Sequence, residues 1–232
     1  MKQKNFRLLI SIIITLSILI FTPTGTKAAE SSWSDNFNAY KIQSYSDGTS
    51  FGSWFVQFAG YGAVNIKSNN KNKFLELVPK IAKSTNETHA ALVTGKSLSG
   101  NILFQTKITT TQQLRTGSTP NPWEVGWVVW NYTDNEHFYY FIPKTNGWEL
   151  GKRDPSYTGG QRFLATGSNI KFPIKRTYTV KVTQDTSNTV TVWVNGNKIT
   201  SFTDKELPYT SGAIGFYSED ARVIVDDVLL SN

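Results

Sequence analysis

The fold class is decided by residues 125–142, Val-Gly-Trp-Val-Val-Trp-Asn-Tyr-Thr-Asp-Asn-Glu-His-Phe-Tyr-Tyr-Phe-Ile. Two apolar runs, Val125–Asn131 and His137–Ile142, flank a short polar turn. This pattern predicts a pair of β-strands. Successive side chains of a strand point to opposite faces, so Trp127 and Trp130 would lie on different faces. Aromatic rings are therefore expected on both faces of the pair, and at least one face must be core.

The same alternation recurs along the rest of the chain. From Ser31 onward, no long segment repeats apolar residues at the helical spacing of three and four. The dipeptides Asn146-Gly147 and Asn195-Gly196 favour two-residue hairpin turns, because both residue types tolerate positive φ. Many short strands with such punctuation are typical of an all-β sandwich or barrel, here as one domain. The other expected strands span residues 74–78, 90–94, 101–111, 148–152, 177–184, 189–194, 198–202, 213–217 and 222–229.

The start of the chain has the layout of a secretory signal peptide. Lys2, Lys4 and Arg7 precede the apolar run Leu8–Phe21, and the helix-breaking stretch of residues 22–25 is followed by small residues at Thr26 and Ala28, with a fourth basic residue, Lys27, between them. An uncleaved membrane anchor is the alternative, but the run is shorter than the roughly 20 residues that span a bilayer. We therefore expect cleavage after Ala28 and a secreted protein with no stable membrane insertion after cleavage.

The two resulting segments are a bacterial-type signal peptide at residues 1–28 and a mature domain at residues 29–232. Cleavage would remove four basic and no acidic residues, which lowers the formal net charge from +7 to +3. A weakly basic protein does not require a nucleic-acid partner, and none is expected. The chain is expected to be a monomer.

Composition excludes several kinds of site. The chain has no cysteine, which rules out disulfides, a thiol nucleophile, an iron–sulfur cluster and a thiolate zinc site. Its only histidines, His89 and His137, are too few for a histidine-rich metal centre. The Gly-x-Ser-x-Gly spacing of serine hydrolases occurs once, at Gly48-Thr49-Ser50-Phe51-Gly52, but the nucleophile elbow needs a strand-to-helix turn and no helix is expected there. Carboxylates and one imidazole near the aromatic segment remain as candidate proton-transfer groups.

Aromatic residues are concentrated between Trp123 and Trp148, where nine occur. Exposed rings suit sugars, because the C–H faces of a sugar stack on a π surface while its hydroxyls form hydrogen bonds at the edge. At least half of the nine rings are expected in the core. The rings expected to be accessible and to stack on a sugar are Trp123, Trp130, Tyr139 and Trp148.

Several motifs together resemble the concanavalin A-like lectin/glucanase superfamily. They are Trp33-Ser34-Asp35-Asn36-Phe37 at the start, Gly126–Trp130 in the middle, and Val190–Gly196, Gly212–Tyr217 and Ala221–Val228 toward the end. The chain resembles most the secreted bacterial branch with 3-keto-disaccharide hydrolase domains and carbohydrate-binding modules. The resemblance implies a jelly-roll β-sandwich of two curved antiparallel sheets, with a glycan lying across the concave sheet. The Glu-x-Asp-x-x-Glu motif of laminarinase-type members is missing.

Two functions follow from these observations. The first is a secreted, lectin-like protein that binds a polysaccharide or oligosaccharide on its concave sheet. The alternative is a secreted glycan-active enzyme, either a glycoside hydrolase or a polysaccharide lyase, whose acid–base groups would be Glu124, Glu149 or His137. A hydrolase needs two carboxyl groups flanking the bond, and a lyase needs a base and a cation. Arg115 and Arg162 are the cations expected to hold substrate. An adhesion or cell-surface interaction protein of the same fold is a third class.

A structural Ca²⁺ is a further possibility near the two ends of the mature chain. Asp35, Asp226 and Asp227 would converge there if the terminal strands pair, and carboxylate oxygens are ligands that Ca²⁺ takes. The ligand spacing of a calcium-binding loop is absent, so ordinary turn and strand-end aspartates are the favoured interpretation. No other cofactor is expected.

Overall fold

The structure is a computed structural model and describes residues 32–231. The expected signal peptide and its cleavage site lie outside the described residues. Within residues 32–231, all of the regular secondary structure is β-strand. The same region contains no helix long and apolar enough to cross a membrane.

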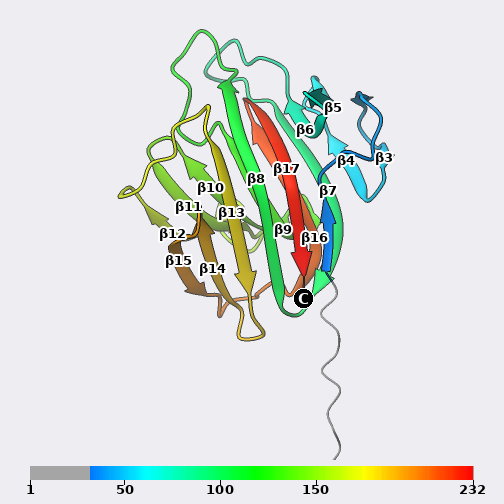
Figure 1. Cartoon of the computed structure of the whole chain (residues 1–232). Coiled ribbons are helices and arrows are strands. Elements are labelled where there is room, and N and C mark those ends of the chain that lie inside the picture. Colours follow the sequence, from blue (N-terminus) through cyan, green and yellow to red (C-terminus); the bar gives the residue numbers. More distant parts are fainter. Residues whose placement is uncertain (1–31, 232) are drawn as a thin grey trace, which may run out of the picture.

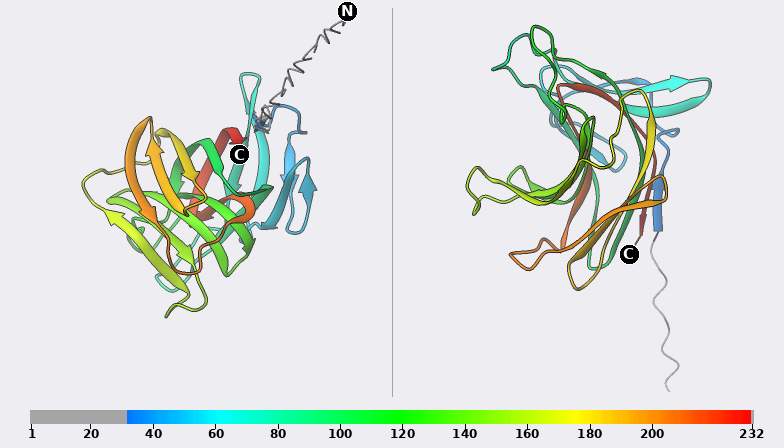
Figure 2. Two further views of the ribbon diagram at one scale, coloured as in Figure 1. Left: turned by 90° about the horizontal axis from the view of Figure 1, so that it is seen from below. Right: turned by 90° about the vertical axis from the view of Figure 1, so that its left-hand side faces the viewer.

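The strands form two antiparallel sheets packed face to face, as the two views of Figure 2 show. We call the one with eight strands the front sheet. It carries both strands of the segment that decides the fold. Its order across the sheet is β12 (Gln161–Gly167), β11 (Gly147–Arg153), β10 (His137–Lys144), β9 (Gly126–Asp134), β16 (Ser211–Glu219), β7 (Ala90–Ser99), β4 (Trp54–Phe58) and β3 (Ser50–Phe51).

The second sheet, which we call the back sheet, joins the two ends of the described chain. Its first strand, β1 (Ser32–Asp35), pairs with its last, β17 (Ala221–Ser231), and the two lie side by side in Figure 1. The expected all-β jelly-roll sandwich is confirmed. The remaining order is β15 (Asn197–Thr203), β14 (Thr189–Val194), β13 (Thr177–Gln184), β8 (Ile102–Gln113), β17, β6 (Asn72–Val78), β5 (Ala63–Asn69) and β2 (Gln43–Tyr45).

Every strand expected from the sequence overlaps an observed one. Six observed strands, β1 to β5 and β12, were not expected, because they are short or interrupted by polar residues. Asn195 and Gly196 both have positive φ, as the hairpin prediction requires. The turn before β11 differs: it is formed by Thr145 and Asn146, without positive φ. Gly147 is needed for another reason, since a Cβ there would collide with the carbonyl oxygen of Gly167.

The front sheet buries apolar residues on both faces. Its inner face, with Val128 and Trp130 of β9, packs against the back sheet in the main core. Its outer face carries a second apolar cluster, which contains Trp127 and Val129 of the same strand and Tyr140 of β10. The predicted alternation is therefore confirmed. An antiparallel sheet usually has one apolar face and one polar face. The front sheet departs from this pattern because its outer face, which would normally be polar, is also apolar.

A buried polar network joins the front sheet to the segment that leads into β16. Lys152 and Asp204 are both fully buried and form an ion pair of 2.8 Å. The hydroxyl of Tyr139 donates to the same carboxylate at 2.6 Å and accepts from the backbone N–H of Tyr209 at 3.1 Å. Burial alone would raise the pKa of Asp204, but the hydrogen bonds from Lys152 and Tyr139 outweigh it and lower the pKa.

The Tyr139→Phe variant is expected to unfold more easily by about 1–3 kcal/mol, because it leaves two buried groups short of a partner. Urea denaturation measures this change. Tyr178→Phe is the matched control, since the Tyr178 hydroxyl donates to the carbonyl of Pro173 in an exposed position. Equal losses in the two variants would show that the buried network adds nothing specific.

Candidate functional site

Two adjoining cavities open on the outer face of the front sheet, and we call them together the outer groove. Their volumes are about 520 and 340 Å³, within the range of ligand-binding pockets. Trp127, Gln161 and Glu219 line both. The larger cavity is further lined by Trp123, Ile142, Lys144, Glu149, Phe163 and Thr166, and the smaller one by Phe58, Leu92, Asn135, Phe138, Arg153 and Tyr217.

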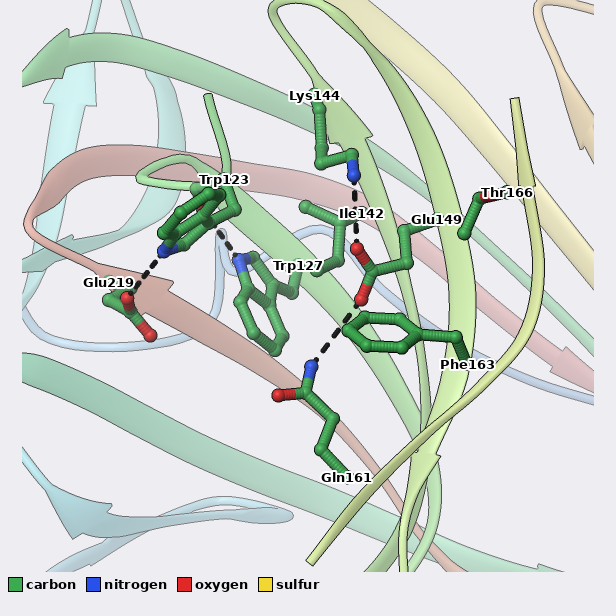
Figure 3. A pocket seen from close by; sticks show the side chains of 9 residues that line it. All are labelled: Trp123, Trp127, Ile142, Lys144, Glu149, Gln161, Phe163, Thr166 and Glu219. Carbon is green, nitrogen blue, oxygen red and sulfur yellow. Dashed lines mark hydrogen bonds and ion pairs between the residues drawn. The ribbon is translucent and has the colours of Figure 1, made fainter. Parts of the chain in front are cut away.

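Trp127 forms the floor of the outer groove. Its ring packs between those of Tyr140 and Tyr217, with centroid distances of 5.1 and 4.7 Å. Its indole N–H donates to the backbone carbonyl of Trp123 at 3.0 Å. Only 8% of Trp127 is exposed, whereas Trp123 and Phe163 are 41% and 59% exposed. Figure 3 shows these two rings on opposite sides of Trp127, so the groove has an aromatic floor and two aromatic rims.

Glu149 lies in the larger cavity with both carboxylate oxygens partnered. One accepts from the Tyr140 hydroxyl at 2.9 Å, and the other from the Lys144 ammonium at 3.0 Å. The side-chain amide of Gln161 reaches the first oxygen at 3.4 Å (Figure 3). The buried carboxylate is therefore charge-balanced, and it orients Lys144 and Gln161 along the groove.

Glu219 lies on the other side of Trp127 and has a different environment. Its carboxylate accepts from the indole N–H of Trp123 at 3.1 Å (Figure 3). It also accepts from the hydroxyl of Tyr217 at 3.0 Å. Within residues 32–231 it forms no ion pair. Burial raises the pKa of Glu219, the charges of Asp220 and Glu124 add to the rise, and its two hydrogen bonds oppose it.

Because of this raised pKa, the stability of the folded protein should depend on pH. The folded protein keeps the Glu219 proton to a higher pH than the unfolded chain, so stability falls as pH rises from the ordinary glutamate pKa of 4.5 through the raised value. Glu219→Gln cannot titrate. Urea denaturation across this range should therefore show wild type losing stability relative to Glu219→Gln as the pH increases. Parallel curves for the two proteins would contradict the prediction.

The structure places three of the four expected stacking rings in the core. Trp130 and Tyr139 are fully buried on the inner face of the front sheet, and Trp148 is 7% exposed in the same core. The predicted accessibility of these three rings is wrong, because all three belong to the core between the sheets, where the back sheet covers them. Trp123 alone is exposed and lines the outer groove.

The prediction that Arg115 and Glu124 act on a substrate is also wrong. The Arg115 guanidinium is buried and pairs with Glu124 at 2.6 Å and Asp220 at 2.7 Å. It also donates to the backbone carbonyl of Ser84. Glu124 is fully buried and accepts a further hydrogen bond from Asn121 at 2.7 Å. Both are part of a buried charge cluster that anchors loops, and neither lines the outer groove.

The other two polar candidates lie outside the groove as well. His137 is paired with Asp134 at 2.8 Å, and its ring meets Tyr209 edge-on. Arg162 pairs with Glu206 at 2.8 Å and lies over the ring of Tyr157. Of the three expected acid–base groups, Glu149 alone lines the groove. The structure therefore does not bring Glu124, Glu149 and His137 together.

The three aspartates considered for Ca²⁺ have separate partners. Asp35 accepts hydrogen bonds from Tyr40 and from the indole of Trp54, Asp226 accepts one from Asn72, and Asp227 pairs with Lys107 at 2.7 Å. Across residues 32–231, no group of three or more acidic or histidine side chains is close enough to hold a metal ion. The pairing of β1 with β17 brings the strands together without gathering the three carboxylates.

Three groove residues were missed by the sequence interpretation. Trp127 lies on the opposite face from Trp130, as the alternation predicts, but the face of Trp130 is the one that the sequence suggests as accessible. Phe163 belongs to β12, which was not expected. Glu219 is distant in sequence and reaches the site because β16 pairs with β9, where Tyr217 stands opposite Trp127. A carboxylate at the end of an aromatic strand, as in Phe216-Tyr217-Ser218-Glu219, was the available signal.

No known family model matches the chain, and no curated protein matches it. Solved structures do. The carbohydrate-binding module CBM66 from Bacillus subtilis superposes with a TM-score of 0.55 and 12% identity over 76% of this chain and 93% of that one.

Two further solved structures are similar to a comparable degree. The carbohydrate recognition domain of Emp47p gives a TM-score of 0.52 at 12% identity, over 87% of this chain and 94% of its own. The globular domain of T. cruzi calreticulin gives 0.52 at 12%, over 85% and 86%. Similarity at this level of identity concerns the fold alone, and it agrees with a jelly-roll β-sandwich over residues 32–231.

Proposed function

We propose that this chain is a secreted, lectin-like protein that binds a polysaccharide or oligosaccharide in the outer groove. The observation that carries the proposal is the pair of exposed rings, Trp123 and Phe163, on either side of Trp127. Exposed rings grouped in a cavity form a contiguous apolar surface, which is typical of a ligand site, and a sugar presents apolar C–H faces to such rings.

The polar groups of the groove suit the remainder of a sugar. Lys144 and Gln161 are held in place by Glu149, and Asn135 lines the smaller cavity. Together they supply hydrogen-bond donors and acceptors beside the rings, which is the usual division between stacking and orientation in a ligand site. Two similar solved structures, by their names a carbohydrate-binding module and a carbohydrate recognition domain, support the same proposal.

A binding function is preferred over a catalytic one because the expected acid–base groups do not meet in the groove. Glu124 is fully buried in its ion pair with Arg115, and His137 pairs with Asp134 outside the groove. Glu149 has both oxygens engaged by neighbouring donors. The groove is thus better equipped to hold a glycan than to transfer protons to it.

A glycan array, followed by pull-down on insoluble polysaccharides, tests the proposal. The double variant Trp123→Ala/Phe163→Ala should lower the affinity for each recognised glycan about tenfold, since an aromatic contact contributes about 0.5–1.5 kcal/mol. The matched control is Trp193→Ala, on the back sheet, where a lysine lies over the ring. Equal losses in both proteins would place the site elsewhere. Release of reducing ends from a bound glycan would favour the enzyme alternative.

Export is part of the same proposal and rests on the signal-peptide layout of residues 1–28. Mass spectrometry of the protein recovered outside the producing cell should give a chain that starts near Ala29. An intact Met1 on the extracellular protein would contradict cleavage.

A further inference from the structure

We infer that the outer groove prefers glycans whose sugars carry a protonated amine, that is, de-N-acetylated amino sugars such as glucosamine polymers. This inference rests on the proposed function and specifies its ligand class. It is carried by the position of Glu219, a half-buried carboxylate without an ion-pair partner within residues 32–231, inside a cavity lined by aromatic rings.

The cationic side chains around Glu219 are paired with other carboxylates. Lys144 pairs with Glu149 at 3.0 Å, and Arg153 pairs with Glu136 at 2.7 Å. Arg115, behind the groove, is shared by the two buried carboxylates of Glu124 and Asp220. The Glu219 end of the groove is therefore negative, and a cationic ligand group would complete its charge balance.

The rings beside Glu219 strengthen this preference. Trp123 donates its indole N–H to the carboxylate, so the edge of that ring is fixed against it. Trp127 lines the same two cavities as Glu219, and Phe58 and Tyr217 line the smaller one. The face of an aromatic ring attracts cations, and the combination of ring faces with a carboxylate is a recognition site for an ammonium group.

The same arrangement disfavours the other common substituents of a sugar ring. An N-acetyl group brings no charge to Glu219, and the carboxylate of a uronic acid would be repelled by it. A hydroxyl is a neutral donor, so its hydrogen bond to Glu219 would be weaker than one from an ammonium group. A lysine side chain also carries an ammonium, but it lacks the sugar ring that the rims formed by Trp123 and Phe163 would hold.

The test compares three β-1,4-linked oligosaccharides of equal length that differ only at the second carbon of each sugar. These are the glucosamine, N-acetylglucosamine and glucose oligomers. Calorimetric titration over a pH series from mildly acidic to neutral should show the glucosamine oligomer binding about tenfold more tightly than either of the others at the pH where Glu219 is ionised and the amine is still protonated, as about 1.4 kcal/mol from an ammonium–carboxylate and cation–π contact implies. Glu219→Gln should reduce this difference to within about twofold by the same conversion.

Glu206→Gln is the matched control, because it makes the same chemical change at an exposed carboxylate outside the groove. It should keep the wild-type preference. Failure of wild type to prefer the glucosamine oligomer, or an unchanged preference in Glu219→Gln, would overturn the inference. Binding of lysine oligomers as tight as that of the glucosamine oligomer would overturn it as well. If array glycans still bind and lose affinity in the Trp123→Ala/Phe163→Ala variant, the proposed function stands while the ammonium preference falls.

Discussion

The Arg115→Met variant is expected to lose about 3–5 kcal/mol of folding stability, the largest effect of any single substitution considered. Methionine fills most of the volume but leaves the carboxylates of Glu124 and Asp220 buried without their cation. One oxygen of Glu124 already lacks a partner among the described residues. Burial raises the pKa of Asp220, and Arg115 is one of the groups that oppose the rise.

Urea denaturation at neutral pH measures this loss. Arg162→Met is the matched control, because Arg162 pairs with the exposed carboxylate of Glu206, and such pairs contribute about 0–1 kcal/mol. Adding Asp220→Asn to Arg115→Met should restore part of the stability, since it removes one of the stranded charges. A loss in Arg115→Met no larger than that of the control would show that the cluster is not a structural anchor.

Trp127→Ala is expected to weaken glycan binding at least about thirtyfold, which corresponds to about 2 kcal/mol, the level of a binding hot spot. The substitution removes the floor of the outer groove. It also removes the support of Tyr217 and Tyr140, whose hydroxyls hold Glu219 and Glu149 in place. Loss of one ring would therefore disturb both carboxylates of the groove.

The measurement is calorimetric titration with the tightest glycan found on the array, accompanied by thermal unfolding to confirm that the variant is folded. Trp127→Phe retains an aromatic floor and should recover most of the affinity. Trp193→Ala, on the outer face of the back sheet, should bind as wild type does. Wild-type affinity in Trp127→Ala would contradict glycan binding in the outer groove.

The fold could be predicted because alternation is a local property of the chain. β9 and β10 pair with Trp130 opposite Tyr139, so the strand pair expected from residues 125–142 is present. Alternation also separated Trp127 from Trp130 correctly. It could not say which face is accessible, because both faces of the front sheet are aromatic, and that depends on where the back sheet packs.

The site was less predictable because its contacts connect distant parts of the chain. Arg115 looked like a free cation in the sequence, but its partner Asp220 lies 105 residues away. Glu219 enters the groove through the pairing of β16 with β9. Phe163 lies on β12, a strand whose apolar alternation is interrupted by polar residues. Single charged residues and short strands carry no local sign of such partners.

The seven tryptophans provide the most direct test of the claim that sugar binds on the outer face of the front sheet. Their indole N–H signals can be followed by nuclear magnetic resonance during titration with a recognised glycan. Binding in the outer groove should shift the signals of Trp123 and Trp127, with little change for Trp54 and Trp130 between the sheets or for Trp193 on the back sheet. Shifts at Trp193 without shifts at Trp123 and Trp127 would contradict it.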